Sequence, residues 1–194
     1  VVLGPSFLQL IQNQEIIFSS QNRNNFANTN SDNLLFIFMN NNISLSQSDQ
    51  LSIPLKKTKH KLTTCFFMPP RKNPKKPGRE LLVNYDQRFP LIPNFKINYT
   101  YYVRFFEPGN TAGNHYHHKK QELFIPIVGN FLVELEDINS KEKEQIKLKQ
   151  NSYQIMYVDT KIAHRVTALD KNSVLLVLAT STNNDDDEFD YNLD

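Results

Sequence analysis

Apolar residues gather in short runs along the second half of the chain. Two of these runs, residues 122–128 (ELFIPIV) and 131–137 (FLVELED), flank a Gly129-Asn130 pair, and the second run alternates apolar with acidic side chains. Such alternation is typical of a strand with one buried face, and a Gly-Asn pair between two apolar runs predicts a hairpin. Similar short runs lie at residues 97–107, 144–149, 152–158, 163–169 and 173–180. Many short strands without a long helical period predict an all-β sandwich or barrel.

Residues 1–80 are different, because they are rich in Asn, Ser and Gln. Their apolar islands, at residues 15–18, 34–39 and 65–68, predict short strands. We therefore divide the chain into an N-terminal extension, residues 1–80, and a barrel with an acidic C-terminal tail, residues 81–194. The extension adds strands to the barrel or serves as a dimer arm, and we interpret the acidic tail as solvated.

A basic stretch, PPRKNPKKPGRE at residues 69–80, ends the extension. It holds four prolines and five basic residues, and proline disfavours both helix and central strand. We interpret it as a solvated, extended linker, and an arm that docks an anionic group is the alternative.

Composition narrows the function. The formal net charge of +2 and the lack of aromatic residues among the basic residues 71–79 give no reason to expect nucleic-acid binding. Cys65 is the one cysteine, so an intramolecular disulfide and a thiolate zinc site are excluded. No apolar run approaches the roughly 18 residues of a membrane span, and the start lacks the features of a signal peptide. We expect a cytoplasmic protein that binds a small-molecule substrate.

Three of the five histidines fall within the stretch NHYHHKKQEL, residues 114–123. On a strand, His115 and His117 project to one face and His118 to the other. A turn through residues 118–121 can fold Glu122 back towards the first two, and His164 begins another predicted strand. Three imidazoles and one carboxylate can thus converge inside a small barrel. They suit Fe, Mn, Co, Ni, Cu or Zn, and an octahedral ion would keep open positions for a substrate.

The spacing Gly109, His115, His117, Glu122, Gly129 resembles the first sequence motif of the cupin superfamily. It fixes five positions within 21 residues. The second cupin motif is degenerate: His164 stands in its place, but Asp159 and Lys161 replace its usual Pro and Gly, and Ala168 replaces its usual Asn. The resemblance covers residues 95–180. It implies a jelly-roll barrel, that is, a double-stranded β-helix, with His115, His117, Glu122 and His164 as the ligands of one divalent transition metal. It also implies a homodimer.

Cupins perform many functions, and three classes stay open. The first is a metal-dependent enzyme on a small polar substrate, either an oxygenase or a Lewis-acid isomerase or lyase. The second is a sugar-nucleotide isomerase or epimerase, because NHYHHKK, FLVELED and the end of the sequence resemble cupins that act on deoxysugar nucleotides. In that class His115 and His117 shuttle protons without a metal. The third is a non-catalytic binding or sensor module.

The complete set of metal-ligand residues leads us to predict the first class. His118, Tyr102 or Tyr157 is the expected proton-transfer group. Arg104 is the expected cation that grips a carboxylate or phosphate of the substrate, and an ordinary surface position is its alternative.

Overall fold

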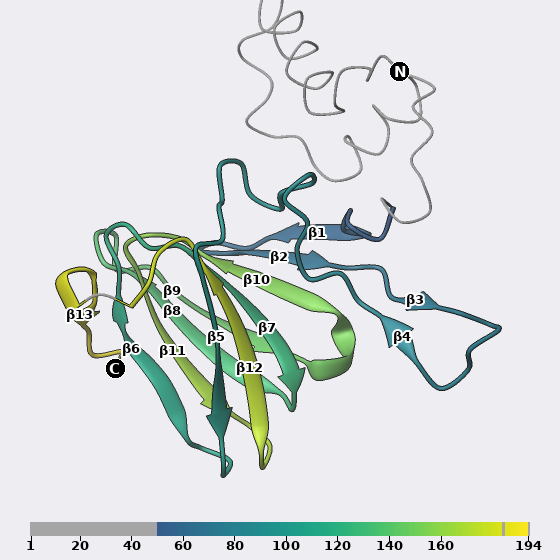
Figure 1. Cartoon of the computed structure of the whole chain (residues 1–194). Helices are drawn as coiled ribbons and strands as arrows, with labels where there is room; N and C mark the ends of the chain where they lie inside the picture. The colour runs from purple at the N-terminus through teal and green to yellow at the C-terminus, as the bar shows by residue number, and fades with distance from the viewer. Residues whose placement is uncertain (1–49, 184, 194) are drawn as a thin grey trace, which may run out of the picture. The chain divides into compact units, whose positions relative to one another are not determined.

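The computed structural model describes residues 50–183 and 185–193, which form antiparallel β-sheets (Figure 1). One sheet has six strands in the order β1-β2-β10-β7-β12-β5, and the other has five in the order β13-β6-β11-β8-β9. A two-stranded ribbon pairs β3 with β4. The strands are β1 Lys56–Lys59, β2 Thr64–Phe67, β3 Arg71–Lys72, β4 Glu80–Leu81, β5 Tyr99–Phe105, β6 Thr111–Tyr116, β7 Glu122–Val128, β8 Phe131–Asp137, β9 Lys143–Leu148, β10 Gln154–Val158, β11 Ile162–Ala168, β12 Ser173–Ala179 and β13 Phe189–Asp190.

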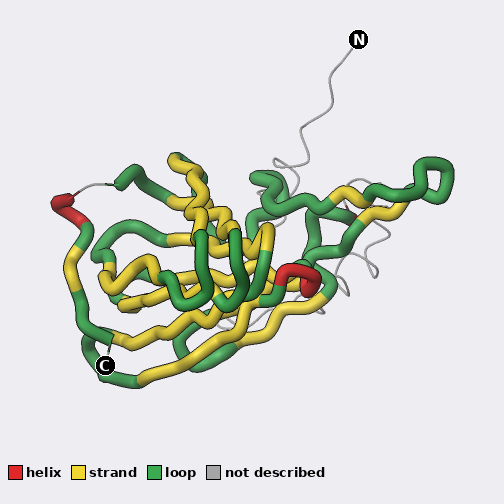
Figure 2. The backbone as a smooth tube through the Cα atoms, turned by 90° about the horizontal axis from the view of Figure 1, so that it is seen from below, coloured by secondary structure: helices red, strands yellow, loops and turns green. Residues whose placement is uncertain are grey.

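The main core lies between the two large sheets. On β8, the alternate residues Phe131, Val133 and Leu135 are buried, as the sequence pattern predicts. They join one apolar cluster with inward side chains of the six-stranded sheet, among them Met156 and Val177. The all-β prediction is confirmed, and the helices that follow the barrel strands are short 3-10 turns at Gln150–Ser152 and Asp185–Asp187 (red in Figure 2).

A second apolar cluster covers the outer face of the six-stranded sheet. On β7, Leu123 and Ile125 belong to this outer cluster, whereas Phe124 belongs to the inner core. The irregular segment before β5 supplies Leu91 and Phe95 to the outer cluster. Because both faces of β7 are covered, its sequence is a continuous apolar run rather than an alternating one.

The predicted N-terminal extension contributes to the barrel. Strands β1 and β2 lie within residues 1–80, and β2 pairs with β10 in the six-stranded sheet. The described residues belong to a compact unit that runs from Leu45 to Asp194. The predicted strands at residues 15–18 and 34–39 lie outside the described residues. The basic stretch forms the β3–β4 ribbon, whose residues are exposed and which extends away from the barrel strands (Figure 1).

No helix among residues 50–183 and 185–193 is long and apolar enough to cross a membrane.

Candidate functional site

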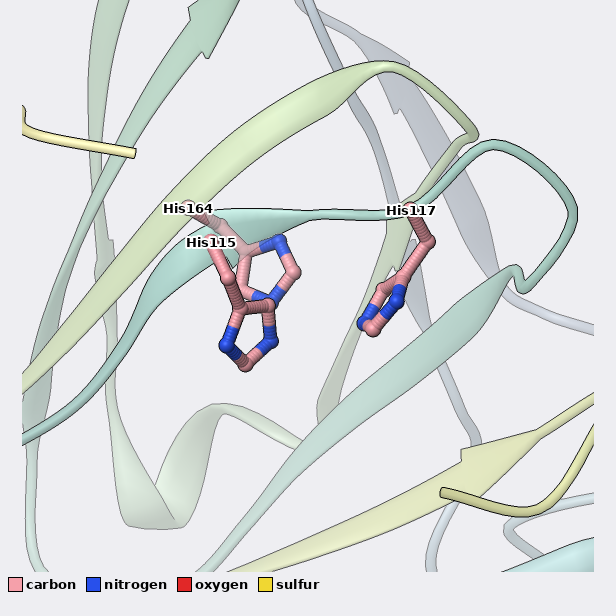
Figure 3. Close-up of side chains that lie close together, drawn as sticks. All are labelled: His115, His117 and His164. Atoms are coloured by element: carbon pink, nitrogen blue, oxygen red, sulfur yellow. The ribbon is translucent and has the colours of Figure 1, made fainter. Parts of the chain in front are cut away.

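Two paired strands of the five-stranded sheet bring three histidines together. His115 lies near the end of β6 and His164 lies opposite it on β11. The centre of the His115 ring is 4.7 Å from the His164 ring and 4.8 Å from the His117 ring. One nitrogen of each imidazole lies within 4.8 Å of the others (Figure 3). The predicted convergence of these three histidines is confirmed.

Glu122 completes the cluster from the first position of β7. Its Oε2 lies 3.4 Å from His164 Nε2 and 4.0 Å from His117 Nε2. The side chains of His117 and Glu122 are only 3% and 1% exposed. The four residues that the sequence grouped therefore lie in one site, in which His117, Glu122 and His164 are buried and His115 is partly exposed.

Two further residues hold the other oxygen of Glu122. The Tyr101 hydroxyl donates a hydrogen bond of 2.9 Å to Glu122 Oε1. The Lys120 ammonium lies 3.4 Å from the same oxygen and is 2% exposed. The sequence analysis did not select either residue. Alternation along β5 places Tyr101 on the inner face, but the face could not be assigned before the pairing of β5 with β12 was known.

Backbone carbonyls orient two of the imidazoles. His117 Nδ1 lies 2.5 Å from the carbonyl oxygen of Asp187, and His164 Nδ1 lies 3.2 Å from that of Ile162. A carbonyl accepts and cannot donate, so each Nδ1 carries a hydrogen, and the neutral form of each ring has its lone pair at Nε2. His117 Nε2 and Glu122 Oε2 are buried and have no hydrogen-bond partner among the described residues. These acceptor atoms face one another.

The C-terminal tail closes one side of the site. The carboxylate of Asp187 accepts hydrogen bonds from the backbone N–H groups of residues 118, 119 and 120. Glu188 Oε1 lies 3.4 Å from His115 Nδ1. This corrects the interpretation of the tail as wholly solvated: Asp187 is buried and β13 pairs with β6.

Burial and neighbouring charges shift the pKa values of three residues in the site. Burial, reinforced by the neighbouring His164, lowers the pKa of His115 to about 4. Burial also lowers the pKa of His164. Burial alone would raise the pKa of Glu122, but His164 and Lys120 outweigh it and hold the pKa of this carboxyl below its ordinary value. These shifts favour the neutral forms of His115 and His164 and the ionised form of Glu122.

The family model "FdtA: WxcM-like, C-terminal" matches residues 75–193, which is more than half of the chain. The chain belongs to this family. The match includes the histidine cluster, Tyr101, Lys120 and the C-terminal tail. A search of the curated proteins returned no match.

Solved structures with the same fold include three ketoisomerases. A 3,4-ketoisomerase from Helicobacter canadensis has a TM-score of 0.57 at 18% identity, and the match covers 67% of this chain and 91% of that one. WlaRA from Campylobacter jejuni, a TDP-fucose-3,4-ketoisomerase, has a TM-score of 0.56 at 22% identity, with coverages of 66% and 87%. A mutant of the 3,4-ketoisomerase QdtA from Thermoanaerobacterium thermosaccharolyticum, in complex with TDP-4-keto-6-deoxyglucose, has a TM-score of 0.56 at 19% identity, with coverages of 68% and 88%. The predicted cupin-type jelly roll is confirmed.

The structure of this WxcM-like chain does not bring the expected catalytic residues to the histidines. Tyr102 is 69% exposed on the outer face of β5, and Arg104 is exposed above the ring of Phe106. His118 is also exposed, and its ring lies against Tyr116 and Phe189. The catalytic roles expected of Tyr102, Arg104 and His118 stay predictions, but all three side chains lie outside the histidine cluster. The physical reason is strand alternation, because the inward neighbours Tyr101 and His117 occupy the site instead.

Tyr157, the remaining candidate for proton transfer, lies on β10. Its hydroxyl is 2.6 Å from Gln121 Nε2, and Gln121 Nε2 also donates to Asp159 Oδ1 at 2.9 Å. The structure thus places Tyr157 in a polar group with Gln121 and Asp159.

The donor atoms of the cluster fit a transition metal. Imidazole nitrogens and a carboxylate oxygen are suitable ligands, and the buried atoms His117 Nε2 and Glu122 Oε2 have free lone pairs that face the other donors. The carbonyl oxygens behind the Nδ1 atoms are of the kind that orient metal-binding histidines. The Lys120 ammonium beside Glu122 is unfavourable to a cation, because it already neutralises the carboxylate.

Proposed function

We propose that this protein is a ketoisomerase of a nucleotide-linked keto-deoxysugar, and that it works by histidine acid–base chemistry without a metal. This was the second of the three classes that the sequence left open. The similarity to three 3,4-ketoisomerase structures supports it over the metal-dependent oxygenase, isomerase or lyase that we predicted first. The observation that carries the proposal is the buried His117 Nε2, whose free lone pair is fixed by the contact of Nδ1 with a carbonyl.

A 3,4-ketoisomerase exchanges a carbonyl and a hydroxyl between two neighbouring ring carbons. A base removes the proton from C3, an enediol forms across C3 and C4, and a proton returns to C4 while the hydroxyl proton moves from O3 to O4. The atoms and electrons balance within the sugar, so no oxidant or reductant is consumed. The reaction needs a base for the proton on C3 and a group that relays the hydroxyl proton from O3 to O4.

The cluster offers groups for each of these steps. In the proposed mechanism, His117 Nε2 takes the proton from C3, exchanges it with solvent and delivers a proton to C4. His115, whose side chain is the most exposed of the three histidines at 18%, is the second proton-transfer group. Glu122 Oε2 accepts a hydrogen bond from the sugar hydroxyl and helps to move its proton. Tyr101 and Lys120 keep the carboxylate in place through Oε1.

The test is isomerisation of TDP-4-keto-6-deoxyglucose by chelator-treated, untagged protein in D₂O, followed by NMR. We expect a 3-keto product and deuterium at the exchanging carbon. A His117→Asn variant should lose about 10²- to 10⁴-fold in rate, which is the usual contribution of a general base. The matched control is His60→Asn, because His60 lies outside the cluster. If wild-type protein leaves the sugar unchanged and exchanges no proton, the proposal is wrong.

A metal-dependent enzyme remains the second candidate. The observation in its favour is that His117 Nε2 and Glu122 Oε2 lack partners among the described residues. One divalent transition metal would be held by His115, His117, Glu122 and His164, and it would polarise a substrate carbonyl as a Lewis acid. Elemental analysis of untagged protein, beside a Glu122→Ala, His164→Ala double variant, tests this. Near-stoichiometric metal in the parent protein and none in the variant would support the metal enzyme, and metal-free active protein would exclude it.

A further inference from the structure

Lys120 carries a buried charge that the steps above use only indirectly. Its side chain is 2% exposed, although it follows the exposed Lys119 directly in the sequence. Lysine is seldom fully buried without partners. This lysine has three: its Nζ lies 3.4 Å from Glu122 Oε1, donates to Asn183 Oδ1 at 2.8 Å, and lies 5.8 Å from the centre of the Tyr101 ring.

The ammonium cannot easily leave this position. The backbone N–H of Lys120 donates to Asp187 Oδ2 at 2.9 Å, so the turn that carries the residue is itself fixed. The carboxylate of Asp187 also accepts from the two preceding N–H groups. A swing of Lys120 towards solvent would leave Glu122 Oε1 with the Tyr101 hydroxyl alone among its described partners. Lys120 is therefore a fixed positive charge within the site.

A divalent metal at the same site would meet this charge. An ion bound to the imidazoles and to Glu122 Oε2 would lie about 2 Å from each ligand atom. The Lys120 ammonium, beside Glu122 Oε1, would then be separated from the ion only by the carboxylate group of Glu122. Water is excluded from side chains that are 1% to 3% exposed, so the repulsion between the two cations is poorly screened. Glu122 and Lys120 together are formally neutral, so they attract a cation less than Glu122 alone.

We propose that Lys120 is a selectivity residue, which keeps divalent metals out of the three-histidine, one-glutamate site and reserves that site for the sugar. Its ammonium neutralises the charge of the Glu122 carboxylate, which a bound metal ion would otherwise do. The unpartnered atoms His117 Nε2 and Glu122 Oε2 then remain available to the substrate. The inference rests on the proposed metal-free function and names the residue that makes the site metal-free.

The experiment is a titration of chelator-treated, untagged, full-length protein with Co²⁺, followed by visible absorption and calorimetry. We expect weak or undetectable binding by the wild-type protein. Lys120→Met should bind Co²⁺ on the order of tenfold more tightly or better, because the charge removed lies beside the ligand carboxylate. Adding Glu122→Gln to Lys120→Met should abolish that gain. Lys120→Gln is a second variant that keeps a hydrogen-bond donor, and circular dichroism checks that each variant is folded.

Lys119→Met is the matched control. It removes the same formal charge one position away, from an exposed residue, and it should leave Co²⁺ affinity unchanged. The inference is overturned if folded Lys120→Met and Lys120→Gln bind Co²⁺ no more tightly than wild type, or if Lys119→Met has an equal effect. It is also overturned if the wild-type protein already binds one Co²⁺ as tightly as the variants. Failure of the proposed function would appear separately, as the absence of isomerisation by wild-type protein.

Discussion

At the scale of single residues, Glu122 decides between the two candidate functions. Its Oε1 is held by Tyr101 and Lys120, while its Oε2 faces His164 and His117. The sequence predicted Glu122 together with His115 and His117, because their spacing is local and matches a known motif. It could not predict Lys120, since nothing in the run of two lysines says which side chain turns inward. The inward choice follows from the buried turn that Asp187 fixes from 67 residues away.

The lowered pKa of His115 predicts how stability depends on pH. The folded protein holds this imidazole neutral down to about pH 4, whereas in the unfolded chain it takes a proton below its ordinary pKa of 6.5. The unfolded state therefore binds more protons in this window, so stability is full above about pH 6.5 and falls as the pH drops towards 4. The lowered pKa of His164 acts in the same direction.

Thermal melting between about pH 7.5 and about pH 4.5 measures this effect. We expect the midpoint to fall with pH, and to fall less steeply in His115→Asn than in wild type. His60→Asn is the control, and it should keep the wild-type slope. Equal slopes in wild type and His115→Asn would show that protonation of His115 is not linked to unfolding.

At the scale of strands, β6 and β11 set the distance between the histidines through a close backbone contact. Gly113 of β6 has a φ of +96°, and an added Cβ would lie 2.5 Å from the carbonyl oxygen of His164. The pairing of β6 with β11 shifts register between His164 and Arg165, next to this contact. Gly113 lies within β6, where the lack of a side chain lets the two histidine-bearing strands approach.

Replacement of Gly113 by alanine should therefore lower the free energy of unfolding by more than the positive φ alone would explain. Gly109 has a similar φ of +84°, but an added Cβ there would meet nothing within 4 Å. We expect Gly109→Ala to lose about 1–2 kcal/mol of unfolding free energy, the usual cost of a left-handed residue. Gly113→Ala should lose about 3 kcal/mol or more, because the clash adds to that cost. Urea denaturation measures both, and equal losses would mean that the contact with His164 is not tight.

At the scale of the whole molecule, the sequence predicted the long strands of the two sheets better than the C-terminal tail that pairs at the edge of one of them. The apolar runs became β5, β7 to β12, because burial between two layers requires the alternation or the continuous apolar run that the sequence displays. The acidic tail was harder to interpret, since Asp187 and Phe189 lie among polar residues with no periodic pattern. Their place depends on backbone N–H groups of residues 118–120 and on pairing with β6, which are long-range contacts.

The predicted homodimer is the last property that belongs to this scale. Strand β5 is the edge of the six-stranded sheet, and its outer face exposes Tyr102 at 69%, while Phe106, which follows the strand, is 59% exposed. Val128, at the end of β7, is 41% exposed. It pairs with Val174 of β12, which pairs with β5 on its other side. An edge strand beside exposed apolar side chains suits pairing with a second copy of the chain.

Light scattering after size-exclusion chromatography should give twice the mass of the chain, and Tyr102→Glu with Phe106→Glu should shift the measured mass towards that of the monomer. Leu81→Glu, at a leucine of the β3–β4 ribbon that is 52% exposed, should leave the dimer intact. A wild-type monomer would contradict the dimer, whereas a dimer that survives the paired change on β5 would move the interface to another face.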